Sequence, residues 1–141
     1  MQNLKKGNQN LLMKSKKIIC IGGKNQIAVD ALKYLINLKL PNNEIVACIT
    51  KTDSGINGWQ PSLKSFCELN SIRMVELKEL YEIKNLIFFS LEFDQIIKPD
   101  LFKSKKLFNI HFSKLPAYKG MFTSVLPILY GETKSAVTLH L

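Results

Sequence analysis

Two polar residues late in the chain, Asn109 and His111, are spaced so that they could act together in catalysis. They belong to the segment LFNIHFSKLPAYKG, residues 107–120, in which an apolar run leads into a loop with proline and glycine. If 107–112 forms a strand, its side chains alternate across the sheet, so Asn109 and His111 share one face. An amide can hold an oxygen that becomes negative, and an imidazole can move a proton near neutral pH.

The same pattern also has a purely structural explanation. An Asn often caps a turn, and a His in an apolar strand is often a buried residue with a satisfied hydrogen bond. Because N-x-H is a short motif, the structural explanation is the more frequent one for an isolated case. The choice between a catalytic and a structural role therefore depends on the elements around Asn109 and His111.

Short apolar runs that end in turn-forming residues predict the strands of an α/β sheet. The predicted strands are residues 16–23, 44–50, 72–77, 86–91, 107–112 and 135–141. Apolar residues at helical spacing predict the helices. These are residues 27–36 with Asn25 as N-cap, 62–70 and 123–130, with shorter helical segments at 78–83 and 94–102. The first strand, helix and second strand form a right-handed βαβ unit.

Gly22 and Gly23, after the first predicted strand, suggest a dinucleotide-binding turn. There is no G-x-G-x-x-G, because Asn25-Gln26-Ile27 occupies the expected glycine positions. The two glycines are therefore assigned to the turn alone, and NAD binding is not expected.

The loop at 51–61, KTDSGINGWQP, follows the carboxyl end of a predicted strand, where open α/β sheets bind ligands. It holds Trp59, the only tryptophan. This side chain could stack on a base or sugar, or it could cap the core, and the sequence leaves both readings open.

Charge, cysteine content and the length of apolar segments exclude several classes of protein. The net charge is +9, but six lysines lie before residue 25 with no acidic residue among them, so the excess is mostly a basic leader. Three scattered cysteines, Cys20, Cys48 and Cys67, indicate buried thiols in a reducing compartment, and no metal site is expected. No apolar segment has the length of a membrane span or of a signal peptide core, which predicts a cytoplasmic protein.

With these elements in place, the chain resembles the formyltransferase family that uses 10-formyltetrahydrofolate. That family includes the glycinamide ribonucleotide, methionyl-tRNA and sugar-nucleotide enzymes. The resemblance rests on FNIHFSKLPAYKG at 108–120, continued by MFTSVLPILYGE and AVTLH. The segments DSGINGWQPSL at 53–63 and KGMFTS at 119–124 resemble the enzymes that formylate amino sugars on a thymidine diphosphate carrier, and the R-G-A-A-P-I segment of the tRNA enzymes is lacking.

The resemblance implies a Rossmann-like, open and mostly parallel twisted sheet with helices on both faces. It also implies that an acceptor amine attacks the formyl carbon of the folate, that Asn109 holds the oxyanion and that His111 takes or relays the amine proton. The residues it assigns to the folate donor are Ser90, Leu91 and Phe93. The residues it assigns to the sugar nucleotide are Trp59, Gln60, Tyr118, Lys119, Gly120 and Thr123.

Relatives complete this site with an Asp in the loop after the V-T-x-H strand, and the sequence ends at Leu141, before that loop. His140 matches a family position but cannot replace a carboxylate that orients His111. The expectation is a flexible leader at 1–16 and a catalytic domain at 17–141 that is truncated at its C-terminal end and weak or inactive as given. Small-molecule substrates are expected, with no membrane or nucleic-acid partner and with a homodimer in the full-length form. The alternatives are a methionyl-tRNA formyltransferase-like enzyme and a folate- or nucleotide-binding remnant without chemistry.

Overall fold

The computed structural model describes residues 16–120 and 123–140. The leader predicted at 1–16 falls, apart from Lys16, outside the described residues, as does Leu141. The strands are β1 (Lys17–Gly23), β2 (Asn43–Ile49), β3 (Arg73–Met74), β4 (Leu86–Leu91), β5 (Leu107–His111) and β6 (Thr138–His140). The helices are α1 (Asn25–Asn37), α2 (Leu63–Leu69) and α3 (Leu126–Leu129), with 3-10 turns η1 (Leu77–Leu80) and η2 (Pro99–Leu101).

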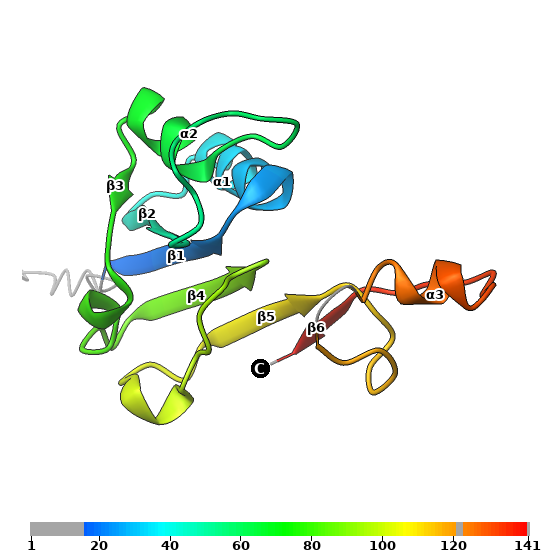
Figure 1. The fold of residues 1–141 in the computed structure, drawn as a ribbon. Coiled ribbons are helices and arrows are strands. Elements are labelled where there is room, and N and C mark those ends of the chain that lie inside the picture. Colours follow the sequence, from blue (N-terminus) through cyan, green and yellow to red (C-terminus); the bar gives the residue numbers. More distant parts are fainter. Residues whose placement is uncertain (1–15, 121–122, 141) are drawn as a thin grey trace, which may run out of the picture.

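The strands form one sheet in the order β3-β2-β1-β4-β5-β6 (Figure 1). All neighbouring pairs are parallel except β5 with β6. The chain moves outward from β1 to β2 and β3, and then returns to the other side of β1 with β4. This reversal between β1 and β4 is the point at which open α/β sheets bind ligands, outside the carboxyl ends of the strands. The predicted fold class, a mostly parallel Rossmann-like α/β sheet, is confirmed.

Strand residues alternate between two apolar clusters, one on each face of the sheet. On one face Ile21 and Ala47 pack with Ala28 and Leu32 of α1 and with Leu63 of α2. On the opposite face the buried residues include Cys20, Val46, Leu80, Phe88 and Phe102, which come from strands, from η1 and from the segment after η2. Helices α1 and α2 thus cover one face, and the 3-10 segments cover the other. All three cysteines are buried with free thiols.

Gly22 and Gly23 are the last residues of β1, and close packing explains them. A Cβ on Gly22 would lie 2.4 Å from Cζ of Phe88, and one on Gly23 would lie 2.2 Å from the carbonyl oxygen of Leu91. Both contacts are with β4, the strand beside β1. The glycines therefore let β1 and β4 approach each other where the strand order reverses, a role different from the turn that the sequence suggested.

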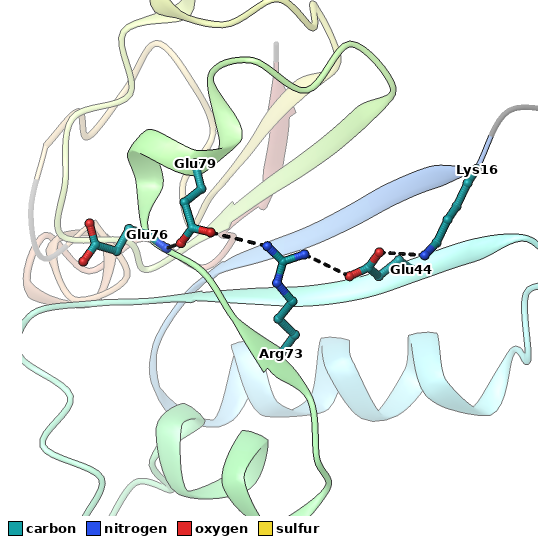
Figure 2. A network of polar contacts seen from close by, with 5 residues as sticks. All are labelled: Lys16, Glu44, Arg73, Glu76 and Glu79. Carbon is teal, nitrogen blue, oxygen red and sulfur yellow. Dashed lines mark hydrogen bonds and ion pairs between the residues drawn. The ribbon is translucent and has the colours of Figure 1, made fainter.

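The outer strand β3 is held by a network of ion pairs on the surface (Figure 2). Arg73 contacts Glu44 of β2 at 3.2 Å and Glu79 of η1 at 3.4 Å, while Glu44 also contacts Lys16 at 2.8 Å. Glu79 accepts the backbone N–H of Glu76 at 2.7 Å, which closes a capping box at the start of η1. These charges cover an edge that would otherwise present unpaired backbone groups.

Several predicted boundaries differ from the structure. The third strand has only two residues, because Leu77, predicted to end it, starts η1. The predicted helical segment at 94–102 is reduced to Pro99–Leu101, and the helix predicted at 123–130 begins only at Leu126. The predicted N-cap Asn25 is the first residue of α1, and its side chain donates to Glu92 at 2.6 Å across the reversal point. No helix among the described residues is long and apolar enough to cross a membrane.

Candidate active site

Asn109 lies in the middle of three adjacent strands. The register pairs it with Ser90 of β4 on one side and with His140 of β6 on the other. Its amide nitrogen lies 3.1 Å from Nε2 of His140. Because an amide nitrogen only donates, Nε2 accepts this bond, and the second amide hydrogen of Asn109 stays available to another acceptor.

A cavity of about 310 Å³ opens beside this group. Ser90, Asn109 and His140 supply polar atoms to its wall, and the other residues are mostly apolar. These others are Phe88, Phe93, Gln95, Ile96, Ile97, Pro99, Leu107 and Phe108. An apolar hollow with a few convergent polar groups is the usual form of a small-molecule site.

His111 shares its strand with Asn109 but has a different partner. Its Nε2 lies 3.0 Å from the carbonyl oxygen of Tyr118. A carbonyl oxygen only accepts, so this contact requires a proton on Nε2 and leaves Nδ1 as the basic nitrogen of the neutral ring. The hydroxyl oxygen of Ser113 lies 3.2 Å from the same carbonyl oxygen and 3.1 Å from that of Ala117, so its one hydrogen is shared between the two acceptors. The turn after β5 thus fixes which nitrogen of His111 can take up a proton.

The backbone of Tyr118, in this same turn, has an unfavourable conformation. Its φ of 52° lies in the left-handed region, which is uncommon for a residue with a large side chain. Its hydroxyl donates to the carboxylate of Glu132, and this bond raises the pKa of the Tyr118 phenol. The ring stacks on Tyr130, with centroids 6.1 Å apart.

The other residues that were predicted to contact the sugar nucleotide after β5 differ in their exposure. Lys119 is exposed, Gly120 adopts a φ of 94° that favours glycine, and Thr123 is buried. Leu91, predicted to contact the folate through its backbone, has its side chain in the core on the α1 face, and its carbonyl oxygen accepts the N–H of Lys24 at 3.3 Å.

The loop at 51–61 is organised by Asp53. Its carboxylate accepts the hydroxyl of Ser62 at 2.5 Å and the backbone N–H groups of Gly55 and Lys64, each at 3.0 Å. Burial raises the pKa of Asp53, but these hydrogen bonds outweigh burial, and the pKa lies below its usual value. The Asp-x-Gly spacing at 53–55 is typical of such a turn, and the contacts with Ser62 and Lys64 come from the fold.

Trp59 and Gln60 lie apart from the Asn109 cavity. Gln60 accepts the backbone N–H of Gln26 at 3.0 Å, so it caps the start of α1 from a distance. Trp59 is 92% exposed, which makes the core-capping interpretation of this residue wrong. Gln60 also lines a hollow of about 190 Å³ with Lys24 and Asn25 beside the reversal point.

The structure therefore brings the predicted residues together in three groups. Ser90, Phe93 and Asn109 line the cavity. His111 and Tyr118 meet in the next turn, while Trp59 and Gln60 lie on the loop near α1. The sequence did not predict a contact between His140 and Asn109, because the two residues are 31 positions apart and meet only through the pairing of β5 with β6.

A larger hollow, of about 650 Å³, was also missed. It lies at the carboxyl ends of β2 and β3, its lining includes Cys48, Lys51 and Lys78, and it shares Gln95 with the Asn109 cavity. Within residues 16–120 and 123–140, no three His, Cys, Asp or Glu side chains are grouped as metal ligands.

Comparisons with known proteins identify what this arrangement is similar to. No protein-family model matches the chain. The structure of WlaRD, a sugar 3N-formyltransferase studied with dTDP and 5-N-formyl-THF, is 53% identical, with a TM-score of 0.82 over 89% of this chain and 46% of that one. The N-formyltransferase from Helicobacter canadensis, in complex with folinic acid and dTDP-3-aminofucose, is 48% identical, with a TM-score of 0.78 over the same shares.

A curated relative is the bifunctional polymyxin resistance protein ArnA of Wigglesworthia glossinidia brevipalpis. It is 34% identical over 74 residues, which are 51% of this chain and 11% of that protein. The chain thus spans about half the length of the two solved relatives and a small part of ArnA. The resemblance seen in the sequence is confirmed: the chain is similar in sequence and in its α/β fold to sugar N-formyltransferases.

Proposed function

We propose that residues 17–141 carry the catalytic unit of an N-formyltransferase that moves a formyl group from 10-formyltetrahydrofolate to the amine of a dTDP-linked amino sugar. The observation that carries this proposal is the Asn109 cavity in a chain 53% identical to a sugar 3N-formyltransferase. The two solved relatives are structures with a formylated folate and with a thymidine nucleotide or nucleotide sugar. The proposed setting is the cytoplasm, and the proposed assembly is a homodimer.

The proposed reaction is an acyl transfer. The amine nitrogen attacks the formyl carbon, and the carbonyl oxygen becomes an oxyanion in a tetrahedral intermediate. Asn109 donates its free amide hydrogen to that oxygen, because its other hydrogen is occupied by His140. Collapse of the intermediate breaks the bond between the formyl carbon and N10 of the folate, and leaves a formamide on the sugar.

His111 moves the proton in this proposal. The contact of Nε2 with the carbonyl of Tyr118 leaves Nδ1 to accept a proton from the attacking amine. That proton, or another from water, returns to N10 as the folate leaves. The role needs no change in the Tyr118 contact during the reaction.

The two substrates are proposed to bind in neighbouring hollows. Ser90 and Phe93 line the apolar cavity, which suits the flat ring of the folate, and Leu91 contributes backbone groups. Tyr118, Lys119, Gly120 and Thr123 are proposed to contact the amino sugar. Trp59, with its exposed ring, and Gln60 are proposed to contact the nucleotide.

Two measurements on the chain test the proposal. Mass spectrometry follows the gain of one formyl group by a dTDP-amino sugar when 10-formyltetrahydrofolate is present, and calorimetry follows binding of 5-formyltetrahydrofolate, which serves as a donor analogue. We expect binding of the analogue and slow formamide formation. Binding without turnover would assign the chain to the folate-binding remnant, and absence of both would overturn the proposal.

A further inference from the structure

The edge of the sheet at which the parallel strands begin is strongly basic. Because β1, β2, β4 and β5 are parallel, their amino ends meet at one edge, opposite the edge that carries the reversal-point loops (Figure 1). Five exposed lysines lie at or just before these strand starts, and we call them the basic rim. They are Lys17, Lys39, Lys84, Lys105 and Lys106.

Backbone hydrogen bonds join the strand starts that carry the rim. Ile18 donates its N–H to the carbonyl of Asn85 at 3.2 Å, and Phe88 donates to the carbonyl of Lys106 at 2.9 Å. Neighbouring strands are about 4.8 Å apart, so the starts of β1, β4 and β5 lie within a screening length of about 10 Å at 0.1 M salt. The rim lysines therefore act on a charged partner as a group.

The acidic residues near the rim are mostly occupied by other lysines. Glu44 pairs with Lys16 at 2.8 Å, and Glu82 pairs with Lys103. Asp100, in η2, is a further exposed acid on the segment that leads to β5. In the described part of the chain, none of the five rim lysines is in an ion pair. The positive charge of the rim is thus not neutralised within the fold.

The opposite edge has no such excess. The residues that follow the carboxyl ends of β1, β2, β4 and β5 combine Lys24, Lys51, Lys114 and Lys119 with Asp53, Glu92 and Asp94, so their charges nearly cancel. The charge that the sequence analysis assigned mainly to the leader is therefore also concentrated on one edge of the folded part. The leader adds further positive charge, because the sequence before Lys16 contains lysines and no acidic residue.

Exposed apolar side chains lie close to the rim. The last turn of α1 leads toward the start of β2, and its Tyr34 is 65% exposed. Leu38, four residues on and therefore on the same side, is 44% exposed. Lysines around a small apolar group fit the surface of an anionic bilayer, where charges meet headgroups and apolar side chains enter the headgroup layer. An aliphatic Leu has no stacking role toward nucleic-acid bases.

We propose that the basic rim docks this protein on a surface of anionic lipid headgroups, with Tyr34 and Leu38 entering the headgroup layer. The reversal-point loops, at the opposite edge of the sheet, then stay open to water. A protein can lie on a bilayer without a spanning helix, so such docking needs no transmembrane segment.

Vesicle co-sedimentation tests the proposal with the whole chain. Vesicles of phosphatidylcholine with phosphatidylglycerol are compared with pure phosphatidylcholine at about 0.1 M salt. The rim variant K84Q/K105Q/K106Q should bind the anionic vesicles about 100-fold more weakly, since each lysine near such a surface contributes about fivefold. The control K51Q/K64Q/K134Q removes the same charge away from the rim and should bind like the wild type. Y34A/L38A should weaken binding by about tenfold.

Three outcomes would overturn the proposal. One is that the wild type does not bind anionic vesicles in preference to neutral ones. Another is that the rim variant and the control lose binding equally, because net charge alone would then explain the attraction. The third is that a structured RNA displaces the vesicles and depends on the same three lysines, which would assign the rim to nucleic acid. Circular dichroism of each variant checks that the fold is retained.

Discussion

At the scale of single residues, Asn109 is the group whose role the structure constrains most. One amide hydrogen is directed at His140, and the other can meet an oxygen in the cavity. The bond to His140 fixes the orientation of the amide before a substrate arrives, and such fixed donors stabilise a transition state without reorganisation at the moment of reaction.

Asn109→Ala should therefore lower kcat by about 10²–10³, with a smaller change in KM, because the lost bond is made mainly to the oxyanion. Formyl transfer to a dTDP-amino sugar measures the effect. Asn37→Ala, at the exposed end of α1, is the matched control and should react like the wild type. An unchanged kcat in Asn109→Ala would remove this residue from the mechanism.

Asp53 is the residue that should link loop stability to pH. Its pKa is lowered in the folded chain, so its contribution to stability is present above its unfolded pKa, about 4, and is lost as the pH falls through the folded value. Asp53→Asn should lower the free energy of unfolding by about 1–3 kcal/mol at neutral pH, because three donors lose a charged acceptor.

Urea unfolding from neutral to acidic pH measures this difference between wild type and Asp53→Asn. The difference should shrink as the pH falls below about 4, where the wild-type carboxyl also becomes neutral. Asp100→Asn, on the exposed 3-10 turn η2, should show little effect at any pH. A constant difference down to acidic pH would mean that charge on Asp53 is not what holds the loop.

At the scale of elements, the contact between β1 and β4 depends on Gly22 and Gly23. Gly23→Ala should destabilise the fold by about 1–3 kcal/mol, because the new Cβ meets the backbone carbonyl of Leu91, which cannot rotate away. Thermal or urea unfolding gives the value. Gly58→Ala is the matched control, since a Cβ there meets nothing within 4 Å. Equal stabilities for the two variants would contradict the close-packing explanation.

The sequence predicted those elements best whose signal is local. Strand β4 has the predicted bounds, because LIFFSL is apolar except for Ser90 and lies between β1 and β5. The third strand was predicted too long, because the apolar residues Val75 and Leu77 pack into the core as strand residues would, although Leu77 starts η1. Apolar periodicity reports burial, and it cannot separate a strand from a 3-10 segment that is buried equally well.

The site was predictable only in part for the same reason. Asn109 and His111 could be placed on one strand from their spacing. The partner of each depends on contacts that the sequence does not encode locally, since His140 pairs through β6 and Tyr118 offers a backbone carbonyl. The role of Gln60 at the start of α1 is likewise a contact between segments 34 residues apart.

At the scale of the whole molecule, the sheet separates two kinds of surface. Its carboxyl edge has the polar hollow beside Gln60, and its amino edge has exposed lysines. If both proposals hold, the nucleotide that Trp59 and Gln60 are proposed to contact and the lipid surface approach the protein from opposite edges. Activity measured in the presence of anionic vesicles would then differ little from activity in solution.

The reactivity of the three buried thiols can be used to measure local unfolding of the layers that cover them. Burial raises the pKa of Cys48 and of Cys67 to about 12, so alkylation needs the surrounding layer to come apart first. Cys20 and Cys48 lie on the face covered by the 3-10 segments, and Cys67 belongs to α2 and is buried on the face that α1 covers. Pulse alkylation followed by mass spectrometry should therefore label the two sets at different rates, with Cys67 first, because α2 has only seven residues and lies near an exposed loop. Equal rates would mean that both layers detach in one cooperative step.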